Sequence, residues 1–316
     1  MDLFMNRYVL RLLCLLLLSC HAAQASEALP FSADQIDKIF SLGRATTFVD
    51  IENDSLLLNH RDGFYTNGLR LTRSYRLPVE NGWQTVGWRF GQQLYTSIDV
   101  RLRPEEISAL DHPYAGWLYG GMFTRSEYRD GSDAYLGIDV GCLGPCAGGE
   151  ATQKFIHRVL HQPKPLGWST QLSNEPGLVL HAGGRAPFWK LGSYVDVRPG
   201  VAMRLGNIFT DLSADASLRA GQLSSVGSDG FAFGFARFGL RAVGYDATLQ
   251  GGLFADETAR TVKPKRLTGE FEVGLQWWRR QWGVRVSAVR RSNEIEGLSE
   301  EAGRQDFLRI SISYTP

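Results

Sequence analysis

Residues 210–222 read TDLSADASLRAGQ, and the pattern of this stretch decides the fold class. From Leu212 onward, apolar side chains occupy every second position, with polar or charged side chains between them. Because successive side chains of a β-strand point to opposite faces, a period of two predicts a strand. One face of that strand carries Leu212 and Leu218, and the other carries Asp215 and Arg219.

The same alternation recurs along the chain. Residues 195–205, 270–277 and 308–314 each set apolar residues on one face against charged or polar residues on the other. A soluble β-sandwich alternates in the same way, so the pattern predicts strands without choosing their environment. The length of the strands and the aromatic residues near their ends inform that choice.

Strand length favours a membrane barrel over a soluble sandwich. The alternating segments are about 10 to 14 residues long, and ten residues tilted by about 40° span the roughly 25 Å of a lipid-facing band. In residues 64–77, Tyr65 and Tyr75 bracket Leu69 and Leu71 on one face, as in a band between two aromatic girdles. We therefore predict a membrane barrel, with the sandwich as the alternative.

Counting the alternating segments gives twelve, an even number, as a bacterial single-chain barrel requires. The segments are residues 46–54, 64–76, 83–95, 114–127, 133–142, 177–184, 192–206, 210–222, 233–246, 266–278, 281–291 and 306–315. With both termini in the periplasm, three outward connections are long, namely residues 96–113, 143–176 and 247–264. The expected fold is an all-β, twelve-stranded antiparallel transmembrane barrel with a short helix in an extracellular loop.

The first 25 residues have the composition of a secretory signal peptide. A short basic start precedes an apolar run over residues 12–18, and small residues stand before Ser26. The apolar run is too short to cross a bilayer, which takes roughly 20 apolar residues. We expect cleavage after Ala25 and a barrel domain over residues 26–316; the alternative is acylation at Cys20.

Charge and cysteine content restrict the partners of the exported chain. Of the 34 basic and 33 acidic residues, Arg7, Arg11 and Asp2 lie in the leader, so the mature chain is formally neutral and nothing indicates a nucleic-acid partner. Cys142 and Cys146 remain, and a local disulfide is expected in an oxidising compartment. Two thiols without a second pair cannot complete a tetrahedral zinc site.

Three polar clusters fall at the outer rim of the predicted barrel. They are residues 52–54 at the end of the first strand, residues 62–68 at the start of the second, and Gln153 with His157 in the long third loop. That loop contains a helix candidate, residues 151–161, and residues four apart share one helix face. A broad apolar face of the same helix carries Phe155, Ile156, Val159 and Leu160. The convergence of polar clusters is the main functional indication in the pattern.

Each polar residue also has an ordinary explanation. Asn53 and Asp54 suit a polar pair that begins a loop, Thr66 an ordinary strand, and His157 a surface helix. In the functional interpretation, Asp54 is a hard oxygen ligand for calcium, and Asn53 adds its amide oxygen or binds a substrate carbonyl. His157 then acts as a general base on a water molecule.

Several short motifs together resemble the outer-membrane lipid A 3'-O-deacylase family. They are IEND at 51–54, YTNG at 65–68, DHPYAGW at 111–117, GPCAGG at 144–149, Gln153, His157-Arg158, GW at 167–168, QLSNE at 171–175 and TLQG at 248–251. Each motif is short, but in this order they extend over essentially the whole mature chain.

The resemblance implies a twelve-stranded barrel with its active site between the outer wall and an extracellular loop helix. It also implies calcium-dependent hydrolysis of an acyl ester of lipid A, in the manner of secreted phospholipase A2. Carried over residue by residue, the family's essential asparagine, aspartate, strand hydroxyl, histidine and neighbouring glutamine match Asn53, Asp54, Thr66, His157 and Gln153. A water deprotonated by the histidine attacks the ester carbon, while Ca²⁺ held by the aspartate stabilises the oxyanion.

The sequence departs from the family pattern at a few places. Cys142 and Cys146 stand where the family has other residues, and the chain ends on Pro316 instead of an aromatic residue. Arg101 and Arg103 lie in the loop where the family has a basic cluster. Either arginine could pair with a lipid A phosphate, or both could be surface charges that face lipopolysaccharide.

We therefore expect a monomer in the outer membrane of a Gram-negative bacterium, with its active site facing the cell exterior and lipopolysaccharide as substrate. Two alternatives remain open. One is a pore or structural barrel whose inward charges line a channel, although their mixed signs favour a paired, filled interior. The other is the same barrel acting on a glycerophospholipid.

Overall fold

The computed structural model describes residues 31–57, 63–223, 230–254 and 259–316, so the predicted signal peptide lies outside it. Its strands are β1 (Arg44–Asn53), β2 (Phe64–Val79), β3 (Gly82–Thr96), β4 (Ala115–Tyr128), β5 (Asp133–Leu143), β6 (Glu175–Arg185), β7 (Trp189–Lys190), β8 (Val195–Gly206), β9 (Phe209–Gln222), β10 (Gly230–Asp246), β11 (Leu267–Arg279), β12 (Trp282–Arg291) and β13 (Gln305–Tyr314). Its α-helices are α2 (Ala33–Leu42), α3 (Gly149–Val159), α4 (Ala247–Gln250) and α5 (Glu300–Gly303). Three 3-10 turns are η1 (Ser55–Leu57), η2 (Pro145–Ala147) and η3 (Gly167–Thr170).

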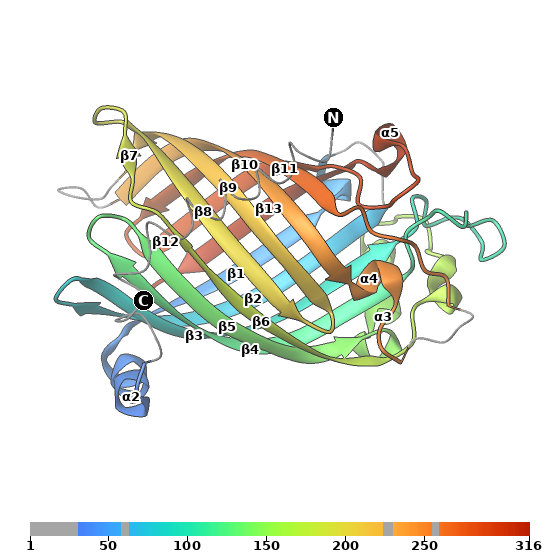
Figure 1. The fold of residues 1–316 in the computed structure, drawn as a ribbon, viewed down its shortest axis with the longest axis horizontal. Helices are drawn as coiled ribbons and strands as arrows, with labels where there is room; N and C mark the ends of the chain where they lie inside the picture. Colours follow the sequence, from blue (N-terminus) through green and yellow to red (C-terminus); the bar gives the residue numbers. More distant parts are fainter. Residues whose placement is uncertain (1–30, 58–62, 224–229, 255–258) are drawn as a thin grey trace, which may run out of the picture.

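The strands form one closed antiparallel barrel (Figure 1). Neighbours in sequence pair with each other, β1 closes onto β13, and β6 pairs with β8 past the two-residue β7. Twelve long strands therefore make the wall, as the sequence predicted. No described helix is long and apolar enough to cross a membrane.

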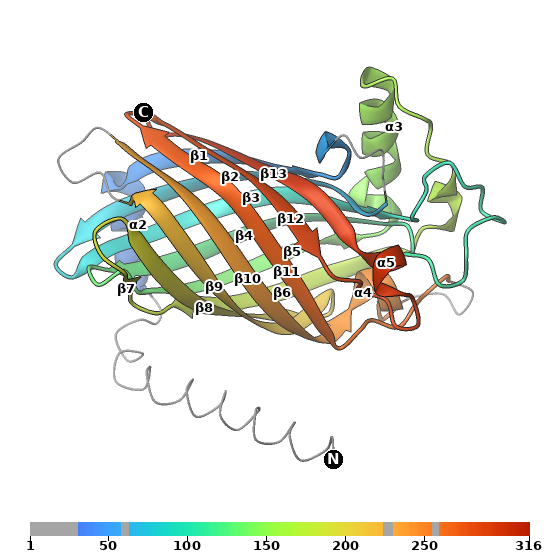
Figure 2. The ribbon, with the colours of Figure 1, turned by 90° about the horizontal axis from the view of Figure 1, so that it is seen from above.

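The two ends of the barrel differ. Helices α3, α4 and α5 gather with the long loops at one end, and the C-terminus and α2 lie at the other (Figures 1 and 2). Outer-membrane barrels have this asymmetry, with long extracellular loops and short periplasmic turns. The end that carries α3 is therefore the extracellular end.

Large apolar side chains cover the outward face of the wall. On β9, Leu212 and Leu218 are exposed as the alternation predicted. The same holds around the barrel for Leu69, Leu71, Phe90, Met122, Val140, Leu180, Met203, Leu205, Phe238, Leu240, Phe271, Val273, Leu275 and Ile312. Such a surface is stable against acyl chains but not against water, so the wall is a lipid-facing band.

Several inward charges are paired with one another. Glu272 is fully buried and accepts hydrogen bonds from Arg237 (3.0 Å), Arg285 (2.8 Å) and Arg309 (3.0 Å). On β8 and β9, Asp196 pairs with Arg219 at 2.6 Å. A buried carboxylate is costly unless it is paired, so these ion pairs give the mixed inward charges a structural role.

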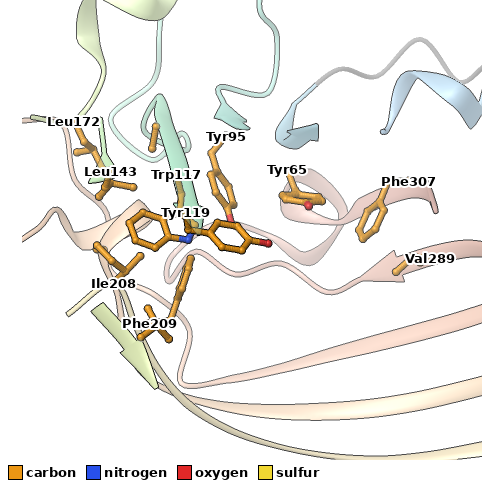
Figure 3. Packing of buried hydrophobic residues seen from close by; sticks show 13 residues of the cluster. Tyr65, Tyr95, Trp117, Tyr119, Leu143, Leu172, Ile208, Phe209, Val289 and Phe307 are labelled. Carbon is orange, nitrogen blue, oxygen red and sulfur yellow. The ribbon is translucent and has the colours of Figure 1, made fainter. Parts of the chain in front are cut away.

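An aromatic cluster lies in the lumen at the extracellular end (Figure 3). It contains Tyr65, Tyr95, Trp117, Tyr119, Leu143, Leu172, Ile208, Phe209, Val289 and Phe307, which come from strands and loops around most of the barrel. Because these side chains pack on one another across the lumen, they brace the wall from inside at the level of the outer loops.

The loop helix begins two residues earlier than its predicted start at Ala151. Gly148 adopts a left-handed φ of 67°, which lets the chain turn from η2 directly into α3 at Gly149. The helix also ends early, because His161 has a positive φ of 55° that helical backbone does not allow. His157 consequently lies in the last turn of α3.

Candidate active site on the outer wall

A β-bulge in β2 determines which way Thr66 faces. The pairing of β2 with β3 shifts between Tyr65 and Asn67, so Thr66 is an extra residue in its strand. The sequence prediction that placed Tyr65 on the lipid face is wrong, because the bulge inverts the alternation and turns Tyr65 into the aromatic cluster. Thr66 then meets Thr96 of β3, and their hydroxyl oxygens are 2.7 Å apart.

The strand register builds a row of residues on the outward face. Asn53 pairs with Asn67, Asn67 with Leu94, and Leu94 with Gly116. Directly paired residues share a face, and Tyr95 next to Leu94 points into the lumen cluster. The row therefore lies on the outside of the barrel, where β1 to β4 meet the loops.

Helix α3 is seated on this outer row. The Gln92 side chain of β3 donates a hydrogen bond of 2.7 Å to the carbonyl of Ala147, just before the helix. A Cβ on Gly149 would lie 2.7 Å from the Trp168 ring and 2.9 Å from Leu94, so only glycine permits this close approach. Leu94 lies beneath α3, and Thr96 contacts Thr66. Both belong to β3, so this one strand contacts the helix that carries Gln153 and His157 and also Thr66 of β2.

Gln153 faces inward from α3 and is only 1% exposed. Its side-chain oxygen accepts a 2.6 Å hydrogen bond from the indole N–H of Trp168, whose ring stands edge-on to Tyr114. Among the described residues, no hydrogen-bond partner is present for the buried Nε2 of Gln153. The amide is thus fixed in orientation and retains donor capacity.

His157 is one turn further along the same face and is 4% exposed. Its Nδ1 lies 2.6 Å from the carbonyl oxygen of Pro163. A carbonyl can only accept, so Nδ1 carries the proton of the neutral ring and Nε2 is its basic nitrogen. Such a backbone contact selects the tautomer and holds the ring plane.

Asn53 and Asp54 lie where β1 leaves the barrel. The amide oxygen of Asn53 accepts hydrogen bonds from the backbone N–H and the hydroxyl of Ser55. Asp54 is 4% exposed, and its Oδ2 accepts a 2.8 Å hydrogen bond from the N–H of Gly63. Asp54 also lines a cavity of about 440 Å³ together with Gly63, Ile98 and residues of α5.

The donor chemistry at Asp54 fits a hard cation. Calcium takes six to eight oxygen ligands, many from backbone carbonyls and water, so a site needs few carboxylates. Among the described residues no cluster of three acidic, histidine or cysteine side chains occurs. Asp54 would be the charged ligand, and Asn53 could add its oxygen if the Ser55 hydroxyl turned away.

Comparison with known proteins identifies the family of the chain. A protein-family model described as "Outer membrane protein LpxR" matches residues 10–315. The chain belongs to the LpxR family. The family resemblance inferred from the motifs and the outer-membrane location are thereby confirmed.

A solved structure of the same family has the same fold. The structure of LpxR from Salmonella typhimurium superposes with a TM-score of 0.72 at 22% identity, covering 86% of this chain and 100% of that one. The β domain of the Bordetella autotransporter BrkA (TM-score 0.46, 11% identity, 86% and 98% covered) and the KdgM porin (0.41, 9%, 86% and 99%) are less similar. No curated protein sequence matches the chain.

The two loop arginines of this LpxR-family chain differ in their surroundings. Arg101 is exposed and makes a two-pronged ion pair with Asp99, with nitrogen–oxygen distances of 2.7 and 2.9 Å. This hydrogen-bonded partner lowers the pKa of Asp99. Among the described residues, no carboxylate lies within ion-pair distance of the Arg103 side chain. The two arginines therefore differ in that the Arg101 side chain is ion-paired with Asp99.

Cys142 and Cys146 are joined by a disulfide, with their Cα atoms 6.1 Å apart. It ties the end of β5 to η2, the turn that leads into α3. The backbone N–H of Cys146 also donates to the Asn174 side chain at 2.8 Å. In this LpxR-family chain the disulfide therefore restrains the root of the helix.

The sequence did not assign roles to several residues that shape the site. Thr96 contacts Thr66, Trp168 orients Gln153, and the Pro163 carbonyl orients His157. Pro163 and Thr96 carry no chemical signal in the sequence, since one acts through its backbone and the other through strand register. Trp168 belongs to a family motif, but its partner appears only once the loop is folded.

A second histidine, His112, lies beneath the site and is 2% exposed. Its Nδ1 donates to the Pro113 carbonyl at 2.7 Å, and its ring stacks on Tyr95 at 5.2 Å. Asp111 accepts hydrogen bonds from the N–H groups of Ile98 and His112 at 2.8 Å each. Burial lowers the pKa of His112 and raises that of Asp111. Asp111 and His112 therefore stabilise the loop that follows β3.

Proposed function

We propose that this LpxR-family chain is a calcium-dependent ester hydrolase that removes a 3'-O-linked acyloxyacyl group from lipid A in the outer leaflet. The observation that carries the proposal is the position of the site. The strand register puts Asn53 on the outward face of the wall, and α3 is seated over the same face with Gln153 and His157 buried, while paired charges and aromatic residues line the lumen. Such a site favours a substrate that already resides in the membrane.

His157 is the proposed general base. With Nδ1 bound to the Pro163 carbonyl, the basic Nε2 can take a proton from water, and the resulting hydroxide attacks the carbonyl carbon of the ester. The tetrahedral intermediate then collapses, the carbon–oxygen bond to the sugar breaks, and the imidazolium gives its proton to the departing sugar oxygen. The products are an acyloxy-substituted fatty acid and lipid A with one sugar hydroxyl uncovered.

Polar groups of the chain can bind the oxygen that becomes negative during this attack. The buried Nε2–H of Gln153 is fixed by Trp168 and offers one donor. The Thr96 hydroxyl can donate to the carbonyl of Ser97 at 3.3 Å, so the Thr66 hydroxyl then donates to Thr96, and Thr66 is proposed to orient His157 or the substrate. Calcium bound at Asp54 and Asn53 would add the positive charge that stabilises an oxyanion.

Arg103 is proposed to bind a lipid A phosphate. Arg101 could do the same if it released Asp99 and bound the substrate instead. Guanidinium groups suit phosphate because they donate two parallel hydrogen bonds. Both arginines lie in the loop that follows β3, the strand that carries Leu94 and Thr96. They would hold the sugar headgroup while the acyl chains lie along the apolar wall.

The test is mass spectrometry of lipid A after incubation with the purified protein in calcium, with and without a chelator. Loss of one acyloxyacyl group in calcium only is the expected result. Unchanged lipid A in calcium would overturn the proposal, and activity that persists in chelator would overturn its metal requirement. Thin-layer analysis of phospholipid in the same samples reports hydrolysis of glycerophospholipid, the alternative substrate.

A further inference from the structure

The loop helix α3 buries two polar residues and exposes large apolar ones. Gln153 and His157 are 1% and 4% exposed, whereas Phe155 and Val159 are 63% and 56% exposed. A helix on the surface of a soluble protein has the opposite arrangement, with its apolar stripe against the core. Water is therefore an unfavourable surrounding for the outer side of α3.

The exposed side chains form one face. Residues four apart lie one above the other on a helix, so Phe155 and Val159 are neighbours, as are Gln153 and His157. Two residues correspond to about 200° of rotation, which places the first pair on the opposite side from the second. Leu160, at the end of the helix, is 54% exposed and extends the apolar surface.

This apolar face continues the lipid-facing band of the barrel. α3 is seated over Leu94 on the outside of β3. Four residues along the same face of β3 is Phe90, which is 53% exposed and belongs to the band. That separation is about 13 Å at 3.3 Å per residue. The helix therefore lies just beyond the extracellular border of the hydrocarbon region.

The direction of α3 suits a membrane surface. Figure 2 shows the helix running across the barrel axis at the extracellular end and reaching out past the wall. A helix across the barrel axis is nearly parallel to the membrane plane. Amphipathic helices in this orientation bury their apolar face at the boundary between headgroups and acyl chains. Arg158, exposed on α3, would then lie among anionic headgroups.

We propose that the face formed by Phe155, Val159 and Leu160 docks into the outer leaflet, with lipid acyl chains as its partner. Docking does not require hydrolysis, so the inference stands apart from the proposed function. Where both hold, the docked helix keeps Gln153 and His157 near the depth of the ester bonds. A lipid substrate can then enter sideways from the leaflet without leaving it.

Spin labelling of the full-length barrel in vesicles of phosphatidylcholine and lipid A tests the docking. A nitroxide is attached to a cysteine introduced by Phe155→Cys, and to one introduced by Glu105→Cys as the control. Residue 105 belongs to the loop between β3 and β4, which extends further along the barrel axis than α3 (Figure 2). The label at 155 should be relaxed mainly by oxygen, which concentrates in lipid, and the label at 105 by a water-soluble nickel complex.

A label at 155 that the nickel complex relaxes as strongly as the label at 105 would overturn the docking. Hydrolysis supplies a second measurement that separates docking from catalysis. Phe155→Ser/Val159→Ser should lower hydrolysis of lipid A in vesicles several-fold and leave hydrolysis of a water-soluble short-chain ester unchanged. An equal loss on both substrates would mean that the face supports the fold of the site, contrary to the proposal. A docked helix without any hydrolysis would overturn only the proposed function.

Discussion

The lumen and the outer wall at the extracellular end treat polar side chains in two different ways. In the lumen, Glu272 is surrounded by three arginines, and opposite charges neutralise each other. On the wall, His157 is held by a backbone carbonyl and Gln153 by an indole N–H. These two hydrogen bonds orient the imidazole and the amide. The comparison indicates that the lumen charges stabilise the barrel, whereas the hydrogen bonds on the wall support the proposed role of His157 and Gln153 in hydrolysis.

The largest expected effect is at His157. His157→Ala should lower the rate of lipid A hydrolysis by about 10² to 10⁴, the usual contribution of a general base. Heat-modifiable migration of the barrel should stay normal, because the side chain lies outside the strand network. His161→Asn is the matched control: it changes an exposed histidine of the same loop to a residue that tolerates positive φ. Equal loss in both variants would contradict the assignment of the base.

Removing the proposed calcium ligand should have the next largest effect on the rate. Asp54→Ala is expected to lower hydrolysis by about 10² to 10³, the range measured when oxyanion stabilisation is lost. A chelator should reduce the wild-type rate by a similar factor and add little to the variant. If the chelator slowed both proteins by the same factor, Asp54 would not be the residue that holds the metal.

A substitution in the lumen should lower the stability of the barrel and leave the rate of hydrolysis unchanged. Glu272→Gln leaves the facing arginines without their shared carboxylate, and breaking a buried ion pair in this way costs about 3–5 kcal/mol. The free energy of unfolding in denaturant should fall by that order. The rate of hydrolysis by the folded fraction should stay as in the wild type. A variant that keeps its stability but loses its activity would break the distinction between lumen and wall.

The strand pattern was visible in the sequence, but the direction of the decisive side chains was not. Alternation identified the strands and the lipid-facing residues of β9 correctly, because one-sided burial repeats over many residues. A tyrosine such as Tyr65 is equally compatible with a lipid-facing position and with an aromatic cluster in the lumen. The neighbouring residues therefore did not reveal the bulge at Thr66. Likewise, the pattern of α3 defined two faces, and only packing against Leu94 and Trp168 decided that the polar face is buried.

A smaller effect on the rate of hydrolysis is expected at Thr66, the bulge residue of β2. Thr66→Val removes the hydroxyl that bonds to Thr96 and keeps the shape of the side chain. One neutral hydrogen bond is worth about 0.5–1.5 kcal/mol, so the rate should fall by roughly 2- to 10-fold. Thr66→Ser restores the hydroxyl and should recover most of the rate. If serine failed to rescue, the methyl group of Thr66, and not its hydroxyl, would be what the site requires.

The smallest expected effect concerns His112, the histidine that lies under the wall without taking part in the proposed chemistry. Burial keeps its pKa below the ordinary value near 6.5, so the unfolded chain binds a proton more readily than the folded one. Stability should therefore be lost as the pH falls below about 6.5, and regained as it rises. His112→Gln should flatten this part of the profile of unfolding free energy against pH between about 5 and 7. The pH profile of hydrolysis should keep its shape in that variant, because the proposed base is His157. A shift in that profile instead would assign the base to the histidine inside the wall.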